Sequence, residues 1–130
     1  MTSPQLLALG SEAFVSLTTF RRTGIGVSTP VWIARDGDAL VVTTPASSGK
    51  VKRLRKNASV TLRPSGRMGN VDPHAPLVTA TASIEADPAE VQRCSEVLHA
   101  KYGAEYTVIM GIESLFAGGR QDRVILRITD

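Results

Sequence analysis

Hydrophobic and polar positions alternate in short stretches along the chain, and a period of two residues predicts β-strands. Six stretches carry this pattern or are rich in β-branched residues: 14–20, 27–34, 40–44, 59–63, 77–84 and 124–128. Gly24 and the Asp36-Gly37 pair predict tight turns between the first three. Pro30 cannot donate to a ladder, so the second strand is expected to be bulged or to lie at a sheet edge.

A longer period appears in two places and predicts helices. From Asp87 to Gly103, a capping residue, Pro88 and a glycine stop enclose an apolar stripe that includes Cys94. Residues 48–57 carry a thinner stripe, residues 3–9 suggest one short helical turn, and 104–119 fit neither pattern. Six strands and two helices predict one mainly β domain over 1–130, a small antiparallel barrel with helical decoration.

Composition fits this picture. The 130 residues are 42% hydrophobic and 21% charged, which suits one globular domain. No apolar run is long enough to span a membrane and the first ten residues carry no secretory signal, so we expect a cytoplasmic protein. The single cysteine excludes an internal disulfide and a multi-cysteine zinc site, and no metal site is expected.

The positive charge is concentrated in one segment. The net charge is +3, and five of the fifteen basic residues lie within residues 50–56. Without those five, ten basic and twelve acidic residues leave a balance of −2. A local cluster points to a local anion such as a phosphate, a polyanionic tail or a nucleic-acid backbone, and the alternative is a solvated helix face.

Motifs for chemistry carried by the protein's own side chains are missing. The Ser48-Gly49-Lys50 run lacks the first glycine and the final hydroxyl of a phosphate-binding P-loop. His74 and His99 have no metal-ligand spacing, and Cys94 lies on an apolar stripe where a buried thiol is expected. If the protein is an enzyme, we expect a cofactor to carry the chemistry.

One arrangement does suit a cofactor. Thr43 and Thr44 end a strand, and a short helix follows with Ser48 at its start, Lys50 in its first turn and Arg53 one turn later. Free amides, hydroxyls and two cations at that point predict a phosphate site. Trp32, on the neighbouring strand, either flanks a flat ring system or belongs to the barrel core.

These residues resemble a known family. Residues 19–24 (TFRRTG), 27–32 (VSTPVW), 42–44 (VTT) and 48–57 (SGKVKRLRKN) are similar to the FMN-binding split β-barrel superfamily. Within it, the chain looks most like the actinobacterial pyridoxamine-phosphate-oxidase-like proteins that use the deazaflavin coenzyme F420. The resemblance covers roughly residues 10–103 and implies a six-stranded antiparallel split β-barrel.

The resemblance also implies cofactor-binding residues. The wall beside the ring is assigned to Ser28, Thr29, Pro30, Val31 and Trp32, and the phosphate to Thr43, Thr44, Ser48, Lys50 and Arg53. The remaining basic residues of the cluster, Lys52, Arg55 and Lys56, suit the polyglutamate tail of F420 better than the single phosphate of FMN.

The implied activity is hydride transfer from reduced F420 to a conjugated small molecule such as an enone, quinone or tetrapyrrole. The implied assembly is a homodimer with the cofactor at the interface, where the partner's 64–70 and 104–119 segments complete the pocket. Tyr102, Tyr106, Arg67 and bulk water are the candidate proton donors. The alternatives are an FMN, FAD or haem protein of the same fold, catalytic or not, and a nucleic-acid-binding barrel, which the scarcity of aromatic residues disfavours.

Overall fold

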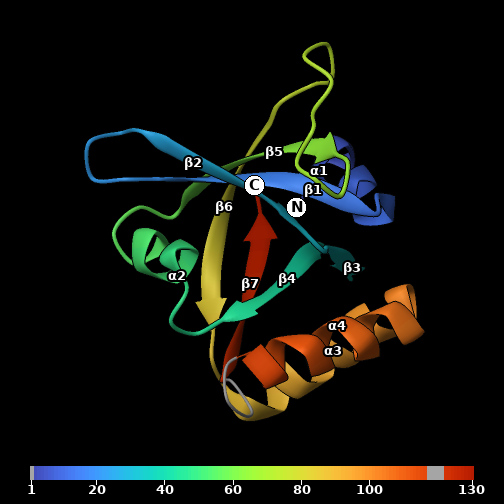
Figure 1. Ribbon diagram of the computed structural model, residues 1–130. Coiled ribbons are helices and arrows are strands. Elements are labelled where there is room, and N and C mark those ends of the chain that lie inside the picture. The colour runs from blue at the N-terminus through green and yellow to red at the C-terminus, as the bar shows by residue number, and fades with distance from the viewer. Residues whose placement is uncertain (1, 117–121) are drawn as a thin grey trace.

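The computed structural model describes residues 2–116 and 122–130, and the side chains of 2–111 and 122–130. Its strands are β1 Phe14–Phe20, β2 Gly26–Val31, β3 Ala34–Asp36, β4 Ala39–Pro45, β5 Ser59–Ser65, β6 Val78–Glu85 and β7 Arg123–Thr129. Its helices are α1 Pro4–Ala8, the 3-10 turn η1 Leu9–Ser11, α2 Gly49–Leu54, α3 Pro88–Tyr102 and α4 Ala104–Phe116. These elements form a mainly β domain with helices around it (Figure 1).

The strands form one antiparallel sheet in the order β2-β1-β5-β6-β7-β4-β3. Its two edge strands, β2 and β3, follow one another in the chain with only Trp32 and Ile33 between them. Two residues span at most about 7 Å, so the sheet has to curl until its two edges meet. The result is the expected split β-barrel.

Seven strands are present where six were expected. The predicted strand 27–34 is divided, because β2 pairs with β1 whereas Ala34 and the residues after it pair with β4. β2 is an edge strand, as Pro30 requires. Residues 104–116, which had no assignment, form α4, and the remainder of 104–119 lies outside the described residues. The predicted helix 48–57 is shorter and ends at Leu54.

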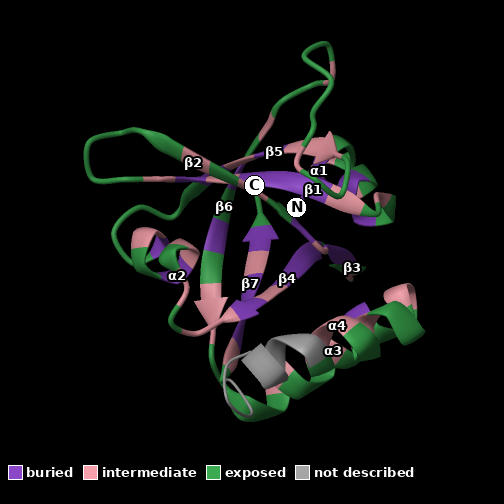
Figure 2. Cartoon of the chain, in the orientation of Figure 1, coloured by how far each residue is buried: buried purple, intermediate pink, exposed green. Residues whose placement is uncertain are grey.

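The apolar side chains divide between the two faces of the sheet. The inner face carries the main core, which includes Leu17, Val42, Leu62, Leu126 and Ile128, all fully buried. Figure 2 shows this purple interior running along β1, β4, β6 and β7. The outer face carries a second cluster beneath α3, formed by Ala34, Val41, Cys94, Leu98 and Ile125. Cys94 is therefore a buried thiol, as its place on the stripe predicts.

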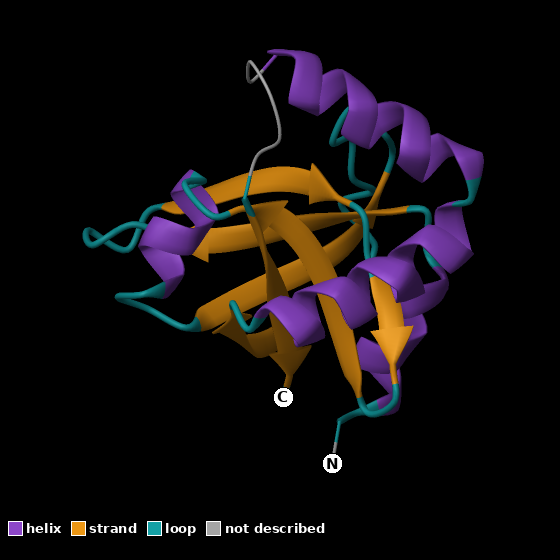
Figure 3. Cartoon of the chain, turned by 90° about the horizontal axis from the view of Figure 1, so that it is seen from below, coloured by secondary structure: helices purple, strands orange, loops and turns teal. Residues whose placement is uncertain are grey.

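Helix α3 fixes the junction between the two sheet edges. The Ile33 amide donates to the Tyr102 hydroxyl at 3.0 Å. The Lys101 ammonium donates to the carbonyl of Ile33, to that of Gly10 at 2.8 Å and to that of Glu12. Figure 3 shows α3 lying against the sheet and α4 turning back from the end of α3. Within the described residues, no helix is long and apolar enough to cross a membrane.

Candidate functional site

The barrel is open between β2 and β4. β2 pairs with β1 alone, and β3 covers only Ala39–Val41 of β4. The rest of β4 pairs with β7 on its other side. Figure 1 shows β2 and β4 diverging from the place where β2 passes into β3, with α2 between their far ends. Two unpaired strand edges offer backbone donors and acceptors to a ligand that lies between them.

The predicted wall on β2 is divided between the two faces of the sheet. The register places Thr29 and Val31 opposite Leu17 and Val15, on the inner face. Ser28 and Pro30 therefore lie on the outer face, because successive strand residues alternate. The Ser28 hydroxyl pairs with that of Thr18 at 2.6 Å. The Thr29 hydroxyl oxygen is buried and has no hydrogen-bond partner among the described residues, so it has capacity for a ligand.

Trp32 belongs to an aromatic cluster and not to the barrel core. Its ring stacks on Tyr102 with centroids 4.6 Å apart and on Tyr106 at 5.8 Å. Tyr106 in turn stacks on His99 at 5.1 Å. The cluster stands at the narrow end of the opening, where β2 passes into β3. It joins that end of the opening to helices α3 and α4.

The structure brings Thr44 and Ser48 together at the far end of β4. Thr44, 3% exposed, donates its hydroxyl proton to Ser48 Oγ at 3.1 Å. Ser48 caps α2 and also accepts from the Val51 amide at 3.4 Å. Its two lone pairs are thus engaged, and its own proton is left to donate to an acceptor such as a phosphate oxygen.

Thr43 does not join this group. It lies on the opposite face of β4, and its hydroxyl accepts from Arg123 Nε at 2.9 Å. That face carries Val41 and is covered by α3. Of the two predicted threonines, only Thr44 faces the barrel interior beside α2.

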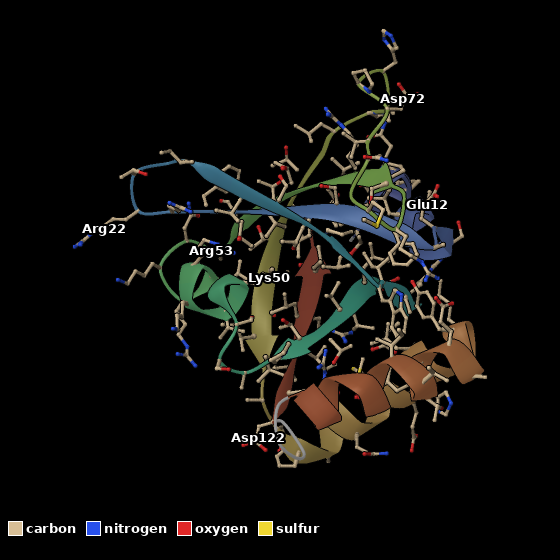
Figure 4. All side chains as sticks on the ribbon, in the orientation of Figure 1. Glu12, Arg22, Lys50, Arg53, Asp72 and Asp122 are labelled. Atoms are coloured by element: carbon tan, nitrogen blue, oxygen red, sulfur yellow. The ribbon has the colours of Figure 1, made fainter. Side chains whose placement is uncertain are left out.

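The basic residues of α2 point in different directions. Figure 4 shows Lys50 on the side of α2 that faces β2 and β4, and Arg53 on the side nearer β1. Arg53 Nε donates to the hydroxyl of Thr19, a fully buried residue of β1, at 2.6 Å. Lys52, Arg55 and Lys56 are exposed. The helix has six residues, so these side chains, rather than its dipole, dominate the local charge.

Two of the three candidate proton donors are already engaged. The Tyr102 hydroxyl donates to the Ala13 carbonyl at 2.8 Å, and burial raises its pKa. Arg67 pairs with Glu105 at 2.6 Å and lies over the Phe14 ring. Neither proton is therefore readily given to a substrate. Tyr106 has no such hydrogen bond among the described residues.

The loop after β5 lies against β2 of the same chain. A Cβ at Gly69 would stand 3.6 Å from Pro30 Cδ. Gly69 therefore lies close to the outer side of β2 within one chain. Gly69 has φ +87°, a conformation that favours glycine.

A cavity of about 720 Å³ lies elsewhere, between α3, α4 and the start of β7. Its lining includes Gln92, His99, Tyr106 and Arg123 and contains none of the predicted cofactor residues. We take the strand opening as the candidate site, because Thr29, Thr44, Ser48 and Lys50 lie around it. No group of three or more metal-ligating side chains occurs among the described residues.

Comparison with known proteins supports the split-barrel assignment. The sequence profile named pyridoxamine 5′-phosphate oxidase matches residues 4–129. No curated protein matches the chain.

Similar solved structures share the fold at low sequence identity. An F420 reductase is 19% identical, with TM-score 0.58 and coverage of 98% of this chain and 94% of that one. HutZ, a haem storage protein from Vibrio cholerae, is 14% identical, with TM-score 0.64 and coverage of 99% and 90%. A conserved hypothetical protein from Mycobacterium tuberculosis is 19% identical, with TM-score 0.67 and coverage of 98% and 79%.

Proposed function

The chain belongs to the pyridoxamine 5′-phosphate oxidase family, and from this premise we propose that it is a reductase dependent on reduced F420. The acceptor would be a conjugated small molecule. The observation that carries the proposal is the opening between β2 and β4, with Ser48, Lys50 and Arg53 gathered at its far end. That arrangement suits a flat ring system joined to a phosphate.

The residues at the opening fit such a cofactor. The buried Thr29 hydroxyl has no partner among the described residues, and a ring carbonyl or nitrogen would supply one. The remaining proton of Ser48 suits a phosphate oxygen. Lys50 and Arg53 add positive charge, and hydrogen bonds to charged groups are the stronger kind. Donors of this kind at one end and a strand edge at the other match a phosphorylated planar molecule.

In the proposed mechanism the protein binds the cofactor, orients its ring and excludes water from the site. Ser48, Lys50 and Arg53 would hold the phosphate, while the unpaired edge of β2 would align the ring. When bound, the reduced deazaflavin supplies a hydride to the acceptor. The aromatic cluster around Trp32 closes the narrow end of the opening. Since Tyr102 and Arg67 are engaged, the proton comes from Tyr106 or from water.

The exposed basic residues favour F420 over FMN. FMN carries one phosphate, and Ser48, Lys50 and Arg53 suffice for it. Lys52, Arg55 and Lys56 are exposed near the same helix, where the polyglutamate tail of F420 would run. Such contacts lie in solvent, so their contribution should fall as salt is added.

We also infer that two copies associate with the cofactor between them. The arm formed by residues 66–77 exposes Met68, Val71 and Leu77. Exposed apolar side chains grouped on one segment are typical of a contact surface. Sedimentation of the purified protein with and without F420 measures this association directly.

The proposal is tested by titrating F420 and FMN in parallel, following Trp32 and cofactor fluorescence. We expect tighter binding of F420, and consumption of reduced F420 when menadione or a cyclic enone is added. Lys50→Ala should weaken F420 binding about tenfold or more, the cost of losing a hydrogen bond to a charged group. Arg22→Ala, at the tip of the β1–β2 turn, is the matched control (Figure 4).

The alternative outcomes separate the candidate functions. Tighter binding of FMN than of F420 would indicate that the protein is one of the flavin-dependent members of the fold. Binding of haem with no turnover of reduced F420 indicates a carrier. Binding of none of these molecules rejects the proposed function and leaves the fold unaffected.

A further inference from the structure

Arg53 is held by a side chain that belongs to a different part of the fold. Its Nε donates to the Thr19 hydroxyl at 2.6 Å, across 34 residues of sequence. Thr19 is fully buried on the inner face of β1, beside the apolar core. A buried hydroxyl surrounded by apolar groups has little freedom, so it fixes the direction of the guanidinium.

A second residue, Gly49, has no side chain and so leaves room for the guanidinium. Gly49 opens α2, one helical turn before Arg53. A Cβ on Gly49 would stand 2.8 Å from an Arg53 terminal nitrogen, closer than real contacts allow. No positive φ requires glycine at this position. A side chain at this position would therefore displace the end of the Arg53 side chain.

The hydrogen bond to Thr19 uses one N–H donor of Arg53 and leaves its other N–H donors for a ligand. A guanidinium has five N–H donors in a planar fork, and Nε carries one of them. Among the described residues, no group accepts a hydrogen bond from the two terminal nitrogens. Such a fork, held at Nε and open at its end, matches a phosphate through two parallel hydrogen bonds.

We propose that Thr19 and Gly49 are positioning residues that aim the Arg53 guanidinium at the phosphate of the bound cofactor. The proposal rests on the proposed function, because it needs a phosphorylated ligand in the opening. It assigns a binding role to two residues that touch no ligand themselves. A purely structural role, in which the bond only attaches α2 to β1, predicts a different response to ligands that lack the phosphate.

The test compares two pairs of ligands. FMN and riboflavin differ by the phosphate alone, and F420 differs from 8-hydroxy-5-deazariboflavin by the phosphate together with its polyglutamate tail. Thr19→Val, which keeps the shape and removes the hydroxyl, should weaken binding of the phosphorylated ligand about tenfold. Binding of the phosphate-free ligand should stay within about twofold. Thr19→Ser restores the hydroxyl and should restore the affinity. Thr81→Val, an exposed position on β6, is the matched control.

A double-mutant cycle separates positioning from general damage. Gly49→Ala should reproduce the selective loss, and neither substitution should add to the loss in Arg53→Met. Urea unfolding of each variant checks that the fold is kept, and Gly49→Ala and Thr19→Ser test the proposal if Thr19→Val does not fold. Equal losses for both members of a ligand pair, or additive losses in the cycle, overturn the positioning role while the proposed function stands. A wild-type protein that binds neither F420 nor FMN overturns both.

Discussion

Replacing Tyr102 by Phe tests the junction that holds the two sheet edges together. The substitution keeps the ring that stacks on Trp32 and removes only the hydroxyl. That hydroxyl accepts from the Ile33 amide at 3.0 Å, and its single proton is shared between the Ala13 carbonyl at 2.8 Å and the Ile33 carbonyl at 3.1 Å. The variant therefore isolates one accepted and one donated hydrogen bond from the packing around them.

The two bonds differ in what their loss costs. Ile33 is fully buried, so its amide would be left without a partner, at a cost of about 1–3 kcal/mol. The Ala13 carbonyl lies where water can replace the hydroxyl, so its loss contributes little. We expect Tyr102→Phe to lower the free energy of unfolding by about 2 kcal/mol.

Urea unfolding followed by Trp32 fluorescence measures this difference. Tyr106→Phe is the control, because its ring also stacks on Trp32 while its hydroxyl has no hydrogen bond among the described residues. Burial raises the pKa of Tyr102, so the unfolded chain loses the proton first and the wild type loses stability as pH rises above about 10. Tyr102→Phe should lack that component. A variant within about 0.5 kcal/mol of the wild type would refute the assignment of the Ile33 amide to this hydroxyl.

Three further changes test other contacts. Arg93 and Arg127 hold the pKa of Asp36 far below its usual range, so this carboxylate stabilises the fold above about pH 4 and the contribution is lost as pH falls below that value. Asp36→Asn should lower the free energy of unfolding by about 2 kcal/mol at pH 7 and flatten its acid dependence in urea titrations. Cys94 is buried, and burial raises the pKa of its thiol. A disulfide reagent should therefore modify Cys94 only as fast as the protein unfolds. Rapid labelling of the folded protein would contradict this burial. Ser48→Ala removes the α2 cap and should cost about 1 kcal/mol by thermal unfolding, with an unchanged midpoint as the contrary result.

Most strands were predictable because their pattern is local. The break at Trp32 and Ile33 was not, since residues 27–34 form one run rich in β-branched residues. What divides that run is a change of pairing partner, fixed by a hydroxyl 69 residues away. Helix α4 was missed because Gly103 was correctly identified as a stop, with φ +62°, but a second helix begins at the next residue.

The arrangement of the candidate site was only partly predictable, and the binding role of its residues stays a prediction. Thr43 and Thr44 were grouped, although strand alternation alone places neighbours on opposite faces. That signal was present in the sequence and would have separated them. Thr19 carried no such signal, because nothing in a local window links a strand threonine to an arginine on a helix 34 residues later.

The place of β7 in the sheet has a consequence for how the chain folds. β7 follows all the other strands in sequence, yet it lies between β6 and β4. Pairings such as Val42 with Leu126 join distant parts of the chain, and folds dominated by such contacts form in milliseconds to seconds. Until β7 is added, β4 and β6 each present an unpaired edge to other molecules. The interval before that last strand docks is therefore when this protein is most exposed to aggregation.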